Sequence, residues 1–146
     1  MTALKIKIDT STDLCAAADK LRRTVFIDEQ GMPEEEVFDG LSGQAIHIVV
    51  FDGCTSVATA RLLKTHDNWQ VGLVAVIQSR RGQHFGEKVM QAAIEFIISN
   101  GGKEILLTAQ QQAYKFYEKL GFEQCGEVTV FESGFVLVPM KRILPN

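Results

Sequence analysis

Residues 71–86 read VGLVAVIQSRRGQHFG, and this stretch decides the fold. Its first seven residues form an apolar run rich in β-formers, which predicts a buried strand. A turn rich in glycine and arginine follows, and from Gly86 onward apolar residues recur at helical spacing. The free N–H groups and the dipole at a helix start attract anions, and Arg80 and Arg81 add positive charge there. The stretch therefore predicts a phosphate or pyrophosphate site, with a tight turn carrying two solvated arginines as the alternative.

Two common phosphate-binding motifs do not fit this stretch. The G-x-G-x-x-G pattern is absent, and no acidic residue is suitably placed after a second strand, which argues against a dinucleotide-binding Rossmann unit. The G-K-S/T sequence of a P-loop is also absent.

Outward from this stretch, the hydrophobic pattern predicts one mixed α/β sheet with the order β-α-(α)-β-β-β-α-β-α-β-β. The unit over residues 71–108 is expected to be parallel, and the flanking hairpins antiparallel. Pro33 suits the first position of a short second helix or stands in a loop. Strands are expected over residues 4–8, 47–51, 56–63, 71–77, 104–108, 128–131 and 135–140, and helices over residues 12–26, 86–97 and 113–120.

Composition excludes several classes of protein. The 146 residues, 46% hydrophobic and 23% charged, fit a single globular domain spanning residues 1–146. A net charge of −3 argues against sequence-independent binding of nucleic acid, and no apolar run is long enough to span a membrane. Cys15, Cys54 and Cys125 are widely spaced, which predicts buried small hydrophobes rather than a zinc site or disulfides. Without a signal peptide, we expect a cytoplasmic protein with no membrane or nucleic-acid partner.

Three pieces of the chain resemble the GNAT N-acetyltransferases. VAV at 74–76 followed by RGQHFG at 81–86 is similar to motif A of that superfamily, Q/R-x-x-G-x-G/A. AYKFYEKLGF at 113–122 resembles its A-x-x-F-Y-E-K-L-G-F motif. VFIDEQGMPEEE at 25–36 is similar to the V-F-V-x-E-Q-x-V-P-x-E-E signature of the ElaA-type and YjcF-type branch, as is the Ala109-Gln110 pair. The pieces stand in the family's order, so the resemblance covers nearly the whole chain and implies the GNAT fold.

The resemblance implies acetyl-CoA as cosubstrate and no metal. In this fold the fourth and fifth strands splay apart, and pantetheine lies between them. Its amides would pair with strand backbone like an added strand, and backbone N–H groups of residues 82–87 would hold the pyrophosphate. The implied cofactor-binding residues are Val74, Ala75, Val76, Arg81, Gly82, Gln83, His84, Phe85, Gly86, Glu87 and Gln110.

The chain departs from the family pattern at four positions. His84 stands where motif A usually has glycine, although its backbone N–H can still donate. Leu73 replaces an arginine often found in this branch, and Gln112 and Leu137 stand where close relatives often carry histidine. These last three departures concern the acceptor half of the site rather than the cofactor half.

Tyr117 is the first candidate catalytic residue, because GNAT enzymes commonly place this motif's tyrosine near the thioester sulfur. Its hydroxyl can protonate the leaving thiolate, or the ring can simply pack at helical spacing with its neighbours. For the general base the candidates are Glu29, the glutamate run at 34–36, and His47. Glu29 ranks first because it belongs to the branch signature. The alternative interpretation of the glutamate run is a solvated helix start. The alternative for His47 is a structural histidine that is hydrogen-bonded within the fold.

Two further polar residues have open roles. Gln110 lies seven residues before Tyr117, where many GNAT enzymes carry an asparagine that touches pantetheine, or it caps the following helix. Arg61 lies on a strand that could border the substrate cleft, but a solvated strand face is the preferred interpretation.

The leading hypothesis is an acetyl-CoA-dependent N-acetyltransferase that works by direct attack in a ternary complex. The acceptor would be a primary amine on a small molecule or peptide, and the acidic net charge favours a cationic one. The alternatives are a CoA-binding module with little or no activity, acting as a sensor or interaction protein, and an unrelated α/β phosphate-binding domain. The C-terminal hairpin could also pair with its copy in a homodimer.

Overall fold

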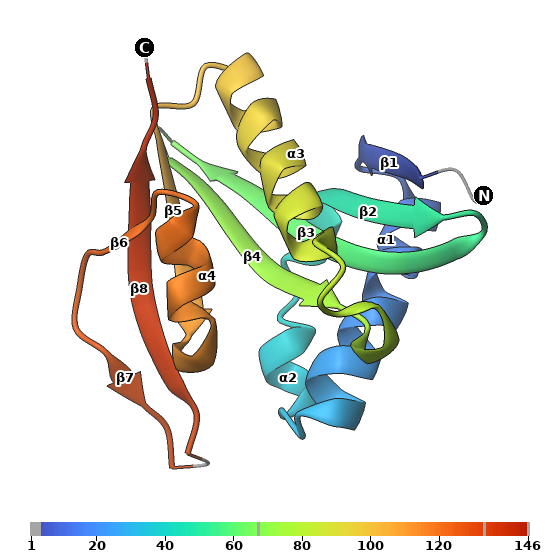
Figure 1. Cartoon of the computed structure of the whole chain (residues 1–146), viewed down its shortest axis with the longest axis horizontal. Coiled ribbons are helices and arrows are strands. Elements are labelled where there is room, and N and C mark those ends of the chain that lie inside the picture. Colours follow the sequence, from blue (N-terminus) through green and yellow to red (C-terminus); the bar gives the residue numbers. More distant parts are fainter. Residues whose placement is uncertain (1–3, 67, 133, 146) are drawn as a thin grey trace.

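The computed structural model describes residues 4–66, 68–132 and 134–145. Within these ranges eight strands form one mixed sheet in the order β1-β2-β3-β4-β5-β8-β6, with β7 paired to β8 (Figure 1). The predicted mixed α/β architecture is confirmed, and β6 is a short strand that the sequence pattern did not indicate. The strands are β1 (Leu4–Asp9), β2 (Ile46–Asp52), β3 (Thr55–Thr65), β4 (Asn68–Val76), β5 (Glu104–Gln110), β6 (Glu123–Gln124), β7 (Thr129–Val130) and β8 (Val136–Ile143).

The first helix is longer than its hydrophobic pattern predicts. Ser11 caps its start by accepting a hydrogen bond from the Leu14 N–H, and a π-helical segment carries it on to Glu29, before the left-handed Gly31. The short helix after Pro33 is present. The helical elements are α1 (Thr12–Arg22), η1 (Arg23–Glu29), α2 (Glu34–Val37), η2 (Ser42–Gln44), η3 (Gln78–Arg80), α3 (Phe85–Ser99), η4 (Gln111–Ala113) and α4 (Tyr114–Lys119).

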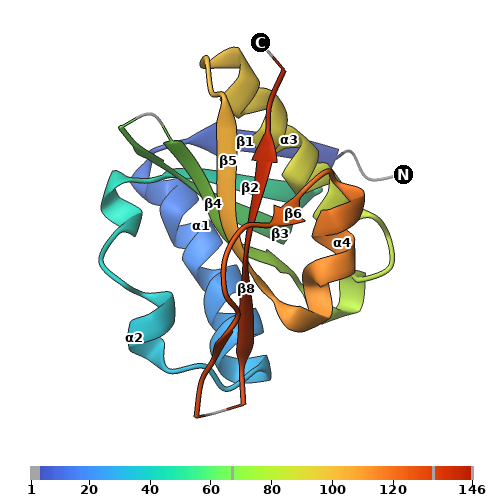
Figure 2. The ribbon, with the colours of Figure 1, turned by 90° about the vertical axis from the view of Figure 1, so that its left-hand side faces the viewer.

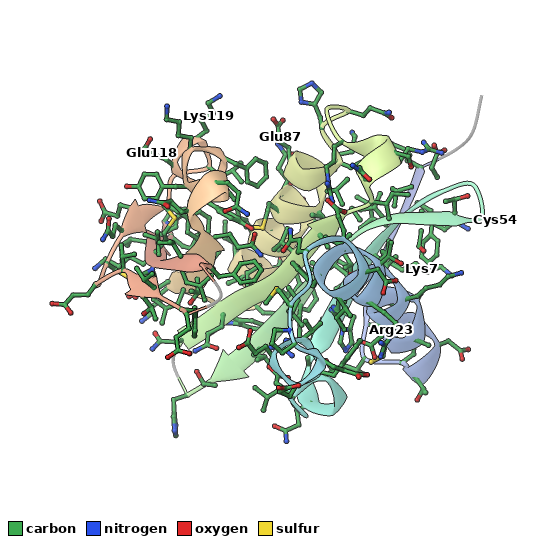
Figure 3. The ribbon with its side chains drawn as sticks, turned by 90° about the horizontal axis from the view of Figure 1, so that it is seen from below. Lys7, Arg23, Cys54, Glu87, Glu118 and Lys119 are labelled. Atoms are coloured by element: carbon green, nitrogen blue, oxygen red, sulfur yellow. The ribbon has the colours of Figure 1, made fainter. Side chains whose placement is uncertain are left out.

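The helices cover both faces of the sheet. Seen from below, α1 with Arg23 beyond its end lies on one face, whereas α3 with Glu87 and α4 with Glu118 lie on the other (Figure 3). Figure 2 likewise shows α2 and α4 on opposite sides of β5 and β8. The inner face of each long helix is apolar and buried, as Leu14 of α1 and Val89 of α3 illustrate. Every helix within the described ranges falls short of the length and apolarity needed to span a bilayer.

The sheet opens between β4 and β5. The described parallel pairing of these two strands is confined to Trp69–Ile105 and Gln70–Leu106, and the strands then diverge (Figure 1). The register of β3 against β4 also shifts by one residue opposite Leu73, which has a positive φ of 49°. Such a bulge bends its strand. The far half of β4 therefore has β3 on one side and an open space on the other.

Candidate active site

A cleft of about 1310 Å³ occupies this opening. It runs between β4 and β5, from the turn before α3 to η1 and the residues that follow it. Its walls are largely apolar, and polar side chains from β4, β5, η1 and the turn before α3 also line it.

The backbone of β4 is directed into the cleft. The Ile77 N–H donates to the Val57 carbonyl of β3 at 3.0 Å, so the alternation of an antiparallel ladder turns the backbone groups of Val76 away from β3. Consistent with this, the Val76 carbonyl accepts a hydrogen bond from Arg81 Nε at 3.1 Å. Val74, Ala75 and Val76 all line the cleft. An extended chain lying in the cleft could pair with this edge.

The turn before α3 has the geometry of an anion site. Gly82 has a φ of 81°, and His84, just before the helix, has a φ of 66° with its side chain 74% exposed. Histidine tolerates the left-handed region better than most residues, which explains how it replaces the glycine usual at this position. The first N–H groups of α3 have no intrahelical acceptor, and Phe85, Gly86 and Glu87 line the cleft.

Gly86 is needed for close packing at the same point. A Cβ added there would lie 3.2 Å from Phe116 Cζ and 3.7 Å from Val76 Cγ2. The start of α3 therefore touches both α4 and β4, and the anion turn is held against the wall of the cleft that carries Tyr117.

The predicted cofactor-binding residues gather in the cleft with one exception, Gln83, which does not line it. Gln110 donates to Gln30 Oε1 at 2.8 Å and accepts from Gln112, so its amide joins the end of β5 to the residue after η1. The lining includes Val74, Ala75, Val76, Arg81, Gly82, His84, Phe85, Gly86, Glu87 and Gln110, and also Leu73, Gln112 and Leu137, at which the chain departs from the family pattern.

Glu29 reaches the cleft, but it is paired there. Its two carboxylate oxygens accept from both terminal nitrogens of Arg81, one at 2.7 Å. These hydrogen bonds hold the pKa of Glu29 below its usual value. While the pair persists, Glu29 is a weak proton acceptor, and the charge of Arg81 is neutralised beside the anion turn.

Tyr117 both packs and lines the cleft. Its ring meets Phe116 and Phe122 edge-on, with centroids 5.0 and 6.1 Å away. Its hydroxyl has no hydrogen-bond partner among the described residues, and burial raises the pKa of the phenol. The group is therefore protonated at neutral pH and free to donate into the cleft.

The structure does not bring His47 to the cleft. Strand β3 separates β2, which carries His47, from β4. The ring is fully buried, with Nδ1 accepting from Arg22 Nη2 at 3.0 Å and Nε2 donating to the Ser42 carbonyl at 2.9 Å. Arginine can only donate, so this histidine is neutral, and burial lowers its pKa. We assign His47 no part in the chemistry.

Arg61 and Asp39 lie together at the η1 end of the cleft, and of the two only Asp39 was not a candidate from the sequence. Arg61 is 7% exposed and makes a bidentate ion pair with Asp39, with distances of 2.8 and 2.9 Å, so the expectation of a solvated strand face is wrong. Of the glutamate run, Glu36 lines the cleft and Glu34 pairs with Arg23 at the surface. The only sequence signal that could have placed Arg61 at the cleft was the position of its strand, β3, next to β4.

Two of the three cysteines lie at the surface. Cys54 and Cys125 are exposed, which corrects the expectation that they are buried, and Cys125 lines the cleft. In the described part of the chain, no group of three or more His, Cys, Asp or Glu side chains could hold a metal ion.

Comparison with known proteins identifies the family. The sequence profile of the acetyltransferase (GNAT) domain matches residues 17–144. The chain is 30% identical over 122 residues to the uncharacterised N-acetyltransferase YjcF of Bacillus subtilis, covering 84% of this chain and 87% of that protein. A solved structure from Lactobacillus plantarum, classed as an N-acetyltransferase, superposes with a TM-score of 0.90 at 27% identity and covers 98% of this chain and 99% of its own. Escherichia coli ElaA superposes with a TM-score of 0.82 at 28% identity, covering 97% and 99%. The chain therefore belongs to the GNAT acetyltransferase domain family, in the ElaA-type and YjcF-type branch that its motifs indicated.

Proposed function

We propose that this protein transfers the acetyl group of acetyl-CoA to a primary amine by direct attack in a ternary complex. The observation that carries the proposal is the cleft itself. It brings the anion turn, the edge of β4 that faces away from β3 and the side chain of Tyr117 into one volume. Membership of the GNAT acetyltransferase domain family supports acyl transfer as the reaction class.

The cofactor half of the cleft suits acetyl-CoA. The pyrophosphate would accept from the N–H groups at the start of α3, where the helix dipole favours negative charge. Gly86 has no side chain, so α3 packs closely against Phe116 and no side chain of this residue stands between the helix start and the pyrophosphate. Pantetheine would extend along Val74, Ala75 and Val76 toward the bulge at Leu73, beyond which β4 and β5 pair at Gln70.

In the transfer step, the amine nitrogen attacks the thioester carbonyl. The C–N bond forms and the C–S bond breaks, so the electron pair of that bond leaves with the sulfur. Backbone N–H groups near Val76 would stabilise the oxyanion, and Tyr117 would donate its proton to the departing thiolate. An ammonium nitrogen must first lose one proton, which Glu29 could take directly or through water once it is free of Arg81, and the second proton that it loses on forming the amide would return through water to the Tyr117 phenolate. Holding the two reactants together in the cleft would supply much of the acceleration.

The acceptor half favours a cationic amine. Glu29, Glu36 and Asp39 line the η1 end of the cleft. Asp39 is paired with Arg61 and Glu29 with Arg81, so the negative charge there comes from Glu36 and, once Arg81 leaves it, from Glu29. Carboxylates at the mouth of a low-dielectric cleft raise the local concentration of cations. The acceptor would be the primary amine of a small molecule or peptide. The three free cysteines suit a reducing compartment, so the proposal includes a cytoplasmic location.

The test is amine-dependent release of free thiol from acetyl-CoA, measured across a panel of primary amines with the acetylated product confirmed by mass. We expect turnover with at least one cationic amine. Calorimetric binding of CoA without amine-dependent thiol release across the panel would instead establish a CoA-binding module with little or no activity.

A further inference from the structure

The end of η1 and the residue after it contact both of the strands that diverge, β4 and β5. Glu29 is bound to Arg81 in the turn that follows β4. Its neighbour Gln30 accepts a hydrogen bond from Gln110 at the end of β5. These contacts join residues 52 and 80 positions apart. Two adjacent residues thus bridge the cleft that β4 and β5 form.

The ion pair in this bridge joins a group expected to bind the cosubstrate and a group expected to bind the acceptor. Arg81 stands at the anion turn, and Glu29 is the carboxylate expected to face the acceptor amine. All three guanidinium nitrogens of Arg81 are engaged, Nε by the Val76 carbonyl and the other two by Glu29. Both carboxylate oxygens of Glu29 are engaged in turn. As long as the pair is intact, the guanidinium charge neutralises the carboxylate and repels an ammonium group that approaches its remaining lone pairs.

Resting on the proposed function, we propose that acetyl-CoA takes Arg81 away from Glu29. The guanidinium exchanges the carboxylate for the pyrophosphate, and the freed carboxylate then faces the acceptor amine. Phosphate offers arginine the same bidentate geometry with more negative charge. The side chains of Arg81 and Glu29 are 40% and 28% exposed, and ion pairs this open to solvent contribute little to stability, so the exchange meets little resistance.

The other half of the bridge keeps the freed carboxylate in place. Gln30 remains tied to Gln110 whether or not Arg81 is bound to Glu29, because its hydrogen bond involves neither charge. The backbone of Glu29 is therefore anchored next to the cleft when its partner leaves. Binding of the cosubstrate and of the amine would then be coupled through one ion pair.

Calorimetric titration with CoA and with inorganic pyrophosphate tests the exchange. Glu29→Gln removes the carboxylate that competes for Arg81, so we expect CoA to bind about 3- to 10-fold more tightly, a gain consistent with the loss of one weak ion pair. Glu34→Gln is the matched control. It deletes the same charge from an ion pair with Arg23 that lies at the surface and does not line the cleft, and it should leave the affinity unchanged.

A double-mutant cycle shows whether the effect passes through Arg81. Arg81→Gln should weaken CoA binding. When Arg81 is already replaced, adding Glu29→Gln should tighten CoA binding very little, because there is no longer an arginine for it to release. An unchanged or weaker affinity in Glu29→Gln, or a full gain that persists without Arg81, overturns the exchange while leaving CoA binding intact. A wild-type protein that binds neither probe overturns the proposed function, and the exchange with it.

Discussion

Replacing Gly86 with aspartate places a negative charge in the anion turn. The new Cβ would lie 3.2 Å from Phe116 Cζ, so that half-buried ring must move by a few tenths of an ångström. Such overpacking costs about 1 kcal/mol where the neighbour can yield. The added carboxylate would stand beside the pyrophosphate. Two like charges 4 Å apart repel by about 1 kcal/mol in water and by about 4 kcal/mol at the effective dielectric near a protein surface. We expect acetyl-CoA to bind about 10- to 100-fold more weakly, or about 1.4–2.8 kcal/mol.

Gly86→Asn separates charge from size, because asparagine fills the same space without the negative charge. Calorimetric titration of acetyl-CoA should show a modest loss of affinity for the asparagine variant and a further loss for the aspartate variant. The free energies of unfolding of the two variants should not follow the order of their affinities, because an acidic residue in the first turn of a helix stabilises the helix by about 0.3–1 kcal/mol. Equal affinities of the two variants would refute the electrostatic reasoning, and wild-type affinity in both would refute the site.

Three other outcomes follow from the same contacts. Tyr117→Phe should lower amine-dependent thiol release by roughly 10²–10⁴-fold with the Kd for acetyl-CoA nearly unchanged; a wild-type rate would mean that another group protonates the thiolate. Asp39→Asn leaves the buried Arg61 unpaired and should lower the free energy of unfolding at pH 7 by about 1–3 kcal/mol, less than for a fully buried pair because the carboxylate is 30% exposed. Because Arg61 lowers the pKa of Asp39, this difference should shrink in urea titrations as the pH falls below the usual range of an aspartate and through that lowered pKa. A gap that stays undiminished down to the lowest pH at which the protein is folded would contradict the ion pair. Burial lowers the pKa of His47 below 6.5, so below that pH the unfolded chain binds a proton more readily than the folded chain does. The free energy of unfolding should therefore fall as the pH decreases from 6.5, by up to about 1.4 kcal/mol per pH unit. His47→Gln should flatten that slope, and an unchanged slope would assign it to another group.

The sequence by itself determined the local elements and the anion turn. Strand and helix periods are short-range patterns, so β2, β3, β4 and α3 follow from alternation or helical spacing over a few residues. The glycines around Arg81 indicate a sharp turn into a helix for the same reason. Motif A lies in β4, the turn and the start of α3, and the second GNAT motif lies in α4, so local sequence is enough to indicate the family.

Only the tertiary structure decided how the residues at the two ends of the cleft are paired. Glu29 meets Arg81, 52 positions away, and Arg61 is buried against Asp39 from a loop. His47 is excluded from the cleft because β3 lies between its strand and β4. The bulge at Leu73 and the early end of the β4–β5 pairing open the cleft itself. Strand order, register and contacts between distant side chains depend on the packing of the whole chain, and no local pattern of residues encodes them.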